Sequence, residues 1–387
     1  MTAQRLAPFG TSVFSAITAL AERHGAINLA QGFPDFDGPA AVIEAAAAAM
    51  RAGQNQYARS MGLPALVRAI AAFYERHYGL DFDPLAEVAV TCGATEGIAA
   101  ALLGLLDPGD EVIVLEPTYD SYAACLAMAG ARPRYVTLRF PDFALDPAAL
   151  RAAAGPRCRA VLLNSPHNPT GKVLDDAELA LIAELCQERD LIAITDEVYE
   201  HLTYDGGRHR PLASLPGMRQ RTLTLSSAGK TLALTGWKVG WAVGPPPLVQ
   251  GLQAAHQFLT FCAATPLQAA VAFALDGLDG AALDRLRADY QLRRDCLCDG
   301  LERAGLRVAR PQGTYFVLAD FSGLSHEDDQ AYVARLMAER GVAAIPPSVF
   351  YPEHPDEGRR LLRFAFCKRM ATLEQAIDRL SGSGAMS

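Results

Sequence analysis

Basic residues are too few in this chain to give it a positive surface. Its 387 residues include 35 Lys and Arg against 43 Asp and Glu, for a formal net charge of −8 and a pI of about 5.5. A sequence-independent grip on nucleic acid or on anionic lipid needs excess positive charge, so we expect neither nucleic acid nor a membrane as a partner. A small anion can still bind in a locally basic pocket. Because 50% of the residues are hydrophobic and only 20% are charged, a disordered chain is excluded as well.

Long hydrophobic runs and paired cysteines are also missing. The longest apolar stretch, residues 97–106, is much shorter than the roughly 20 residues that span a bilayer. The N-terminus has no basic run that leads into an apolar core, so we expect no signal peptide. Eight cysteines include no Cys-x-x-Cys pair, and the single Cys-x-Cys, at 296–298, lies in a helical pattern. We interpret them as buried, reduced thiols of a cytoplasmic protein.

Several common catalytic motifs are absent. Gly229-Lys230-Thr231 resembles the end of a P-loop, but Thr224 stands where the leading glycine belongs. No Gly-x-Gly-x-x-Gly follows a predicted strand, and neither His-Glu-x-x-His nor Gly-x-Ser-x-Gly occurs. The sequence therefore contains no motif typical of metal-dependent catalysis or of a serine acyl-enzyme, and we expect no metal site.

What the sequence does contain is a regular alternation of strands and helices between about residues 87 and 243. The strand-like segments are apolar on both faces, and helical stretches separate them, which is typical of a mainly parallel sheet covered by helices. We therefore predict an α/β fold with seven strands, at 87–91, 111–115, 134–138, 159–163, 191–195, 222–225 and 239–243.

The pattern changes after about residue 280. A long amphipathic helix is predicted over 283–305, followed by β-like segments at 314–319, 342–345 and 361–366 and by a terminal helix. We interpret this part as a smaller α+β domain. The expected division is a large domain at 36–280 and a small domain formed by 1–35 and 281–387.

Polar segments stand where the predicted strands end, and in open α/β sheets these ends build the binding crevice. Each segment alone is weak evidence, because an Asn-Pro-Thr-Gly is an ordinary turn and an Asp after a strand often caps a helix. Together, in this order, they form a specific pattern. They are Gly93-Ala-Thr-Glu96, Glu116-Pro-Thr-Tyr119, Asn164-Ser-Pro-His-Asn-Pro-Thr-Gly171, Asp196-Glu-Val-Tyr199, and Ser226-Ser-Ala-Gly-Lys230 continuing to Gly236-Trp-Lys238.

With these segments the chain, from about residue 5 to 380, resembles the class I/II aminotransferases, pyridoxal 5'-phosphate enzymes of fold type I. Further phrases place the resemblance nearest the methionine and kynurenine aminotransferase branch. They are Asn28-Leu-Ala-Gln-Gly-Phe-Pro-Asp-Phe36, Asn55-Gln-Tyr57, Tyr119-Asp-Ser-Tyr122, Ser227-Ala-Gly-Lys-Thr231, Thr235-Gly-Trp-Lys-Val-Gly240, Gly313-Thr-Tyr-Phe316 and Gly341-Val-Ala-Ala-Ile-Pro346.

The resemblance implies roles for the residues around the cofactor ring. Lys230 resembles the lysine that binds the cofactor covalently. A lysine forms such a bond as a neutral amine, so the pocket around it must lower its pKa. The alternative is a lysine in a solvated loop. Asp196 resembles the carboxylate that faces the pyridine nitrogen; otherwise it caps a helix. Tyr199 and Asn168 resemble the donors to the phenolic oxygen of the ring, although Asn168 could simply set a turn. Tyr119 resembles the stacking aromatic, with a plain core tyrosine as its alternative.

The resemblance also implies ligands for the cofactor phosphate. The backbone N–H groups of Ala94 and Thr95 open a helix, which is a natural anion site. Ser227 and Lys238 match the side-chain ligands; many relatives carry Arg at the Lys238 position, so the charge is kept but the bidentate fork is lost. Tyr57 resembles a ligand donated by the other subunit and is the main reason to expect a homodimer. A local packing tyrosine is its alternative, and core packing suits Tyr122 better than a site role.

For the substrate, Arg363 resembles the arginine that grips the α-carboxylate, because a planar fork matches that group; an internal salt bridge is the alternative. Gly32 matches a backbone segment that closes over the carboxylate, and Asn168 is expected to bind substrate too. The implied activity is transfer of the α-amino group of an apolar or aromatic L-amino acid, methionine first and aromatic amino acids or kynurenine next, to a 2-oxo acid. The alternatives are a C–S β-lyase acting on cysteine conjugates and a non-catalytic regulatory domain on the same fold.

Overall fold

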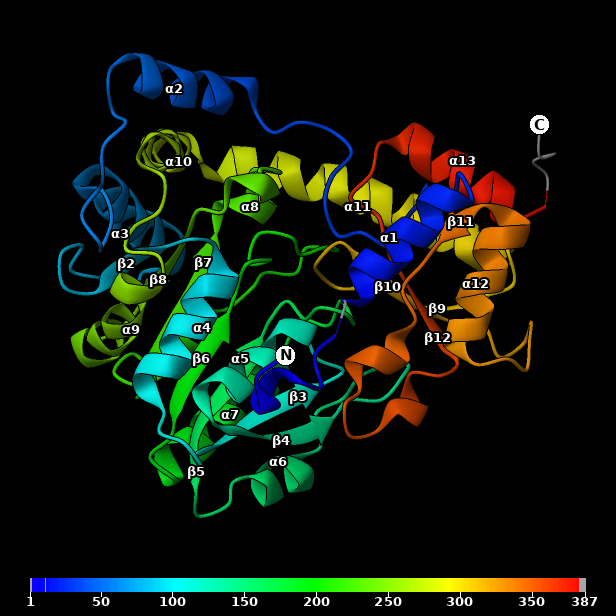
Figure 1. Ribbon diagram of the computed structural model, residues 1–387, viewed down its shortest axis with the longest axis horizontal. Helices are drawn as coiled ribbons and strands as arrows, with labels where there is room; N and C mark the ends of the chain where they lie inside the picture. Colours follow the sequence, from blue (N-terminus) through cyan, green and yellow to red (C-terminus); the bar gives the residue numbers. More distant parts are fainter. Residues whose placement is uncertain (1, 11, 383–387) are drawn as a thin grey trace.

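The computed structural model describes residues 2–10 and 12–382, and its largest feature is a seven-stranded sheet (Figure 1). The strand order is β2-β8-β7-β6-β5-β3-β4; β8 is antiparallel to both of its neighbours, and all other pairs are parallel. The prediction of a mainly parallel seven-stranded sheet is confirmed, with every strand end within two residues of its expected place. The strands are β2 (Val88–Thr91), β3 (Glu111–Glu116), β4 (Arg132–Thr137), β5 (Cys158–Asn164), β6 (Ile192–Asp196), β7 (Thr222–Ser227) and β8 (Gly240–Val243).

Helices cover both faces of this sheet because successive strand side chains point to opposite sides. Val112 and Val114 join the apolar cluster of one face, whereas Ile113 and Leu115 join a cluster on the other. The first face is covered by α4 (Ala94–Leu105), α5 (Asp120–Ala129) and α9 (Pro246–Leu259). The second is covered by α6 (Pro147–Ala153) and α7 (Asp176–Glu188) and, toward β2 and β8, by α2 (Ala40–Arg51), α3 (Pro64–Tyr78) and α10 (Thr265–Gly277).

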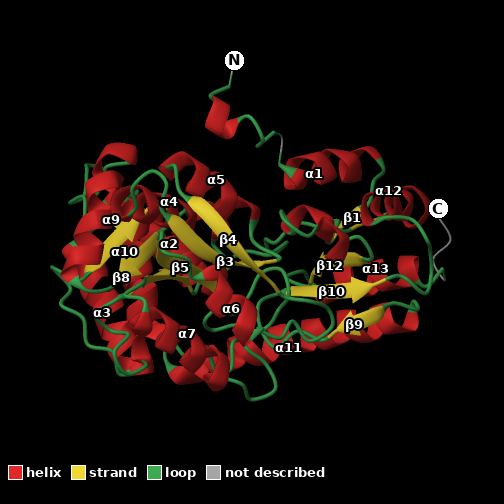
Figure 2. Ribbon diagram, turned by 90° about the horizontal axis from the view of Figure 1, so that it is seen from below, coloured by secondary structure: helices red, strands yellow, loops and turns green. Residues whose placement is uncertain are grey.

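The remaining strands form two small sheets, which Figure 2 shows to one side of the large sheet. β10 (Phe316–Asp320) lies between β12 (Leu361–Ala365) and β9 (Arg307–Ala309), antiparallel to both, and β1 (Ile27–Asn28) pairs in parallel with β11 (Val342–Ala343). Their helices are α1 (Val13–Arg23), α11 (Gly280–Arg303), α12 (Asp329–Arg340) and α13 (Met370–Leu380). Short 3-10 turns occupy Gln4–Leu6, Leu212–Ser214, Thr235–Trp237, Pro347–Phe350 and Pro355–Glu357.

This part of the chain departs from the predictions in three places. β1 and β9 were not expected, because two and three residues are too few to leave a pattern in the sequence. The strand expected from residue 314 begins only at Phe316, since Thr314 has a left-handed backbone with φ +65°. The strand expected over 342–345 ends at Ala343, and Ile345 makes only an isolated bridge to Arg363.

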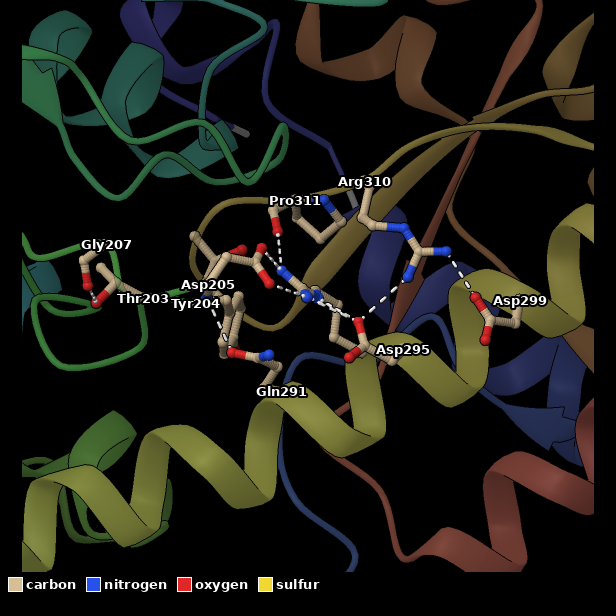
Figure 3. A network of polar contacts seen from close by, with 11 residues as sticks. Thr203, Tyr204, Asp205, Gly207, Gln291, Asp295, Asp299, Arg310 and Pro311 are labelled. Carbon is tan, nitrogen blue, oxygen red and sulfur yellow. Dashed lines mark hydrogen bonds and ion pairs between the residues drawn. The ribbon is translucent and has the colours of Figure 1, made fainter.

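A network of polar contacts joins α11 to loops that follow β6 and β9, and Figure 3 labels Asp205, Asp295, Arg310 and Pro311 in it. The Arg294 guanidinium donates two hydrogen bonds to the carboxylate of Asp205, at 2.5 and 2.8 Å, and one to the carbonyl of Pro311 at 3.1 Å. Asp295 accepts from both Arg294 and Arg310, at 2.8 and 3.1 Å. Because the Arg294 side chain is only 2% exposed, these partners compensate the loss of its hydration.

Two further expectations concern the state of the cysteines and the lack of a membrane-spanning segment. All eight cysteines are free thiols, and five of them are buried. None of the helices in the described part of the chain combines the length and the apolar character that crossing a membrane requires.

Candidate active site

A cavity of about 310 Å³ lies where the parallel strands of the large sheet end. Its walls come from the segments after β2, β3, β5, β6 and β7, from residues 31–33, and from β10 and β12. Every predicted site residue except Tyr57 lines it. The predicted residues that it brings together are Gly32, Ala94, Thr95, Tyr119, Asn168, Asp196, Tyr199, Ser227, Lys230, Lys238 and Arg363.

Lys230 lies on the one-turn helix α8 (Ala228–Thr231), which directly follows β7. Its Nζ donates a hydrogen bond of 2.9 Å to the hydroxyl of Tyr315 and lies 5.6 Å from the ring centre of Tyr199. Burial lowers the pKa of this amine to about 8, against the opposing effects of Cys367 and Asp196. A usable fraction of the amine is therefore neutral near pH 7, which both nucleophilic attack and proton abstraction require.

Asp196 ends β6 with its carboxylate buried at the bottom of the cavity. The hydroxyl of Tyr122 donates to its Oδ2 at 2.7 Å, and the backbone N–H of Val198 donates to Oδ1 at 3.3 Å. Burial raises the pKa of Asp196, while the bond from Tyr122 lowers it. Tyr122 was expected only to pack; it is buried, but it also supports the charge of this carboxylate, which the sequence pattern did not reveal.

Arg363, on β12, is 1% exposed and holds its guanidinium against the cavity. Nη1 donates to the side-chain oxygen of Asn168 and Nη2 to the carbonyl of Ala30, each at 3.0 Å. Both acceptors are neutral, and the Nε atom is buried without a partner among the described residues. Burial lowers the pKa of Arg363 to about 10. A buried fork with neutral partners favours an incoming carboxylate.

Three rings surround this guanidinium. The ring centres of Phe316, Phe350 and Phe14 lie 4.1, 5.0 and 5.2 Å from its central carbon. Phe14 comes from α1, which the sequence analysis did not connect with the site. The apolar surroundings strengthen any ion pair that a substrate carboxylate forms there.

An anion cradle lies at the start of α4. Gly93, with φ +79°, precedes the helix, whose first N–H groups have no partner inside it. A Cβ on residue 93 would lie 3.1 Å from the Nζ of Lys238, so the glycine makes room for this ammonium group. Ser227, at the end of β7, lines the same cavity. The donor set of backbone N–H groups, a hydroxyl and an ammonium fits a phosphate.

Two phenols complete the walls. Burial raises the pKa of Tyr119 to about 12 and that of Tyr199 well above its ordinary value, so both stay protonated and can donate hydrogen bonds. Together with the amine of Lys230, the carboxylate of Asp196 and the phosphate cradle, they match what pyridoxal 5'-phosphate presents: an aldehyde, a ring nitrogen, a phenolic oxygen and a phosphate. The residues present fit this cofactor.

Tyr57 is the predicted residue that the cavity does not include. Its side chain is 85% exposed and meets the ring of Phe261 edge-on at 5.4 Å. Within its own chain it therefore does not contact the phosphate cradle.

Tyr315 is the contact to Lys230 that sequence reasoning missed. It lies in the segment Gly313-Thr-Tyr-Phe316, which contributes to the family resemblance but carries no predicted role. The signal that could have found it is its place directly before β10, after Gly313, where a Cβ would lie 2.8 Å from the carbonyl oxygen of Leu202.

Comparisons with known proteins agree with this geometry. The family model "Aminotransferase class I and II" matches residues 24–380. A Mycobacterium tuberculosis protein named "Probable N-succinyldiaminopimelate aminotransferase DapC" is 51% identical over 98% of both chains, and the methionine aminotransferase of Escherichia coli is 40% identical over 97% of both.

Solved structures show the same relation. That of N-succinyldiaminopimelate aminotransferase from Mycobacterium tuberculosis superposes with a TM-score of 0.96 at 50% identity, covering 99% of this chain and 100% of the other. An Escherichia coli structure described as having a methionine aminotransferase function gives 0.94 at 39% identity, covering 99% of each chain. The chain therefore belongs to the class I and II aminotransferases and is a pyridoxal-phosphate-dependent aminotransferase of fold type I.

Proposed function

We propose that this enzyme transfers the α-amino group of an apolar or aromatic L-amino acid to a 2-oxo acid, with methionine as the first donor and aromatic amino acids or kynurenine next. The observation that carries this proposal is the lining of the cavity. One guanidinium, that of Arg363, faces it with neutral partners, and the surfaces around it are those of Phe14, Phe33, Tyr119 and Phe316. Such a wall favours a substrate with one carboxylate and an apolar side chain.

Each residue has a proposed task in the reaction. The bound cofactor supplies a conjugated ring that takes up the electron pair left at the substrate α-carbon. The buried carboxylate of Asp196 would keep a proton on the ring nitrogen, and the hydrogen bond from Tyr122 favours its ionised form against the effect of burial. Lys230 takes the α-proton at its neutral Nζ and later returns it. Arg363 and the backbone at Gly32 fix the substrate carboxylate.

The remaining proposed contacts hold the cofactor. Tyr199 and Asn168 donate to its phenolic oxygen, and Tyr119 stacks on its ring. The phosphate is bound by the N–H groups of Ala94 and Thr95 and by the side chains that join them in the cradle, Ser227 and Lys238.

The 51% identical mycobacterial relative favours a second candidate, N-succinyldiaminopimelate. This donor carries further carboxylates, for which a matching cation is expected. Among the described residues that line the cavity, the cations are Lys230, Lys238 and Arg363, and all three have proposed tasks. The lining within one chain therefore supports the apolar donor over the carboxylate-rich one.

A donor panel with the purified enzyme tests the choice. Methionine, phenylalanine, kynurenine, aspartate and N-succinyldiaminopimelate are compared by kcat/KM with 2-oxoglutarate and other 2-oxo acids. We expect methionine to exceed aspartate and N-succinyldiaminopimelate; the reverse order would overturn the proposed specificity. Replacing Lys230 by Ala should abolish transfer for every donor. Pyruvate released from cysteine conjugates without any 2-oxo acid would reveal the β-lyase alternative.

A homodimer is the proposed assembly, with Tyr57 reaching the phosphate of the partner site. Support comes from exposed apolar side chains: Phe261, which contacts Tyr57, is 45% exposed, and Phe258 and Leu259, just before it in the chain, are 86% and 49% exposed. Surfaces of this kind commonly mark an interface. Light scattering should give twice the mass of one chain, and Tyr57→Phe should weaken cofactor binding without changing that mass.

The division into a large domain, 36–280, and a small domain, 1–35 with 281–387, also remains a proposal, as does a cytoplasmic location. The domain division is supported by the apolar cluster that joins Ile17, Ala21 and Leu29 to residues between 290 and 377. The pairing of β1 with β11 connects the same two parts of the chain.

A further inference from the structure

The hydroxyl of Tyr315 stands between two parts of the active site that are far apart in the sequence. It accepts a hydrogen bond of 2.9 Å from the Nζ of Lys230 and donates one to the carbonyl of Gly32. The direction of the second bond is fixed, because a carbonyl oxygen can only accept. The lone pairs of the hydroxyl are therefore the ones that face Lys230.

The surrounding structure holds Tyr315 in a fixed position. Its side chain is 0% exposed, and its ring meets that of Tyr199 edge-on at 5.2 Å and stacks on that of Tyr290 at 6.2 Å. Thr314, directly before it, has φ +65°, which is unusual for a β-branched residue. The backbone N–H of Thr314 donates to the carbonyl of Leu202 at 2.9 Å. Strain of this kind persists only where neighbours impose it, and it is concentrated at functional sites.

Gly32 is pressed against the same rings. A Cβ at this position would lie 2.5 Å from the Phe316 ring and 3.3 Å from the Tyr315 ring, so only glycine lets its backbone approach them. The carbonyl of Gly32 thereby reaches the Tyr315 hydroxyl, while the same residue lines the cavity.

The charged and titratable groups around Lys230 act in opposite directions on its pKa, so a neutral hydrogen-bond acceptor can shift that pKa. Asp196 and Cys367 favour its protonated form, whereas Lys238, Arg363 and above all burial oppose it. The Tyr315 phenol stays neutral, because burial holds its pKa well above the ordinary value. A neutral acceptor stabilises the ammonium form of Lys230 more than the amine form, because a charged donor makes the stronger hydrogen bond.

From this geometry we infer that Tyr315 is a positioning residue for Lys230: its hydroxyl holds the lysine amine whenever it is free and connects it to the Gly32 segment that faces the substrate carboxylate. The inference rests on the proposed roles of Lys230 and Gly32. It assigns to Tyr315 a specific effect on the acid–base behaviour of one amine, which a purely packing role would not have.

The test compares Tyr315→Phe with Tyr290→Phe. Both changes remove one hydroxyl and keep the ring, but the Tyr290 hydroxyl is buried without a partner among the described residues, so it serves as the matched control. In the full-length cofactor-free protein, acetylation of Lys230 by acetic anhydride is followed by mass spectrometry across pH. The wild-type profile should have its midpoint near the Lys230 pKa of about 8.

In Tyr315→Phe the midpoint should move toward 7, which makes Lys230 about fivefold more reactive at pH 7, while Tyr290→Phe keeps the wild-type profile. In the cofactor-loaded enzyme, the acidic arm of the kcat profile, along which Lys230 loses its proton, should move in the same direction. Equal profiles for Tyr315→Phe and the wild type, with both proteins melting at the same temperature, would overturn the inference. The proposed function fails separately, if Lys230→Ala keeps its transferase activity.

Discussion

The bond between Tyr122 and Asp196 allows a sharp test of how this site holds its buried negative charge. Tyr122→Phe deletes one oxygen and leaves the ring in place. The lost bond is 2.7 Å long and joins side chains that are 2% and 5% exposed, so no bulk water is at hand to replace it. A hydrogen bond to a charged group in such a place contributes about 1.5–3 kcal/mol.

That energy corresponds to roughly a tenfold to hundredfold change in an equilibrium constant. Without Tyr122, the Asp196 carboxylate keeps, among the residues that the structure describes, only the longer bond from Val198, at 3.3 Å, so its ionised form becomes less favourable. Because an ionised Asp196 is needed opposite the protonated ring nitrogen, the Kd of pyridoxal 5'-phosphate should rise by about tenfold or more. The defect should shrink as pH rises, since higher pH restores the carboxylate.

The assay is a spectroscopic titration of the cofactor-free protein with pyridoxal 5'-phosphate at pH 7 and pH 9. Tyr290→Phe is again the control, because its hydroxyl has no partner among the described residues. If Tyr122→Phe and Tyr290→Phe bind the cofactor with equal affinity at pH 7, the reasoning about Asp196 is wrong.

Three further predictions follow from single contacts. Lys230→Met should stabilise the cofactor-free protein at pH 7, because burial lowers the pKa of Lys230 from 10.5 to about 8 on folding, so the unfolded chain binds the proton more tightly. The gain in the free energy of unfolding should fade as pH rises from 8 to 10.5. Urea unfolding at pH 7 and pH 10.5 measures it, and an equal gain at both pH values would contradict the reasoning. Arg363→Lys should raise the KM for the amino donor by roughly tenfold to hundredfold, because the fork is lost, and leave the cofactor Kd unchanged; an unchanged KM would refute the carboxylate role. Gly104→Ala should lower the urea midpoint, because the added Cβ would lie 1.9 Å from the carbonyl oxygen of Gly251 where α4 contacts α9, and overpacking costs about 1–3 kcal/mol of stability. Gly277→Ala is the control, since no atom lies within 4 Å of its added Cβ, and it should unfold close to the wild-type midpoint. Equal losses of stability in the two variants would argue against a clash at Gly104.

Most strands of the large sheet could be predicted because they are apolar on both faces and end at a polar or glycine-containing segment. The edge strand β4 is apolar on one face only, since Arg132 and Arg134 are exposed. Since parallel strands bring their carboxyl ends to one edge, the same pattern predicts that Asn168, Asp196, Ser227 and Lys230 lie together, and all four line the cavity. The short strands β1 and β9 left no such pattern, because two and three residues are too few to show one, and β1 in addition pairs with β11 near the other end of the chain.

The sequence by itself determined the family, the α/β architecture and the residue types that the chemistry needs, since these follow from local periodicity and from motifs within a few residues. Only the tertiary structure decided which side chains support them. Tyr122 reaches Asp196 across 74 positions, and Arg363 reaches Asn168 across 195. Tyr315 reaches Gly32 across 283. Hydrogen bonds between residues so far apart in the sequence depend on strand order and on the packing of the small sheets against the large one. The spacing of motifs along the chain determines neither.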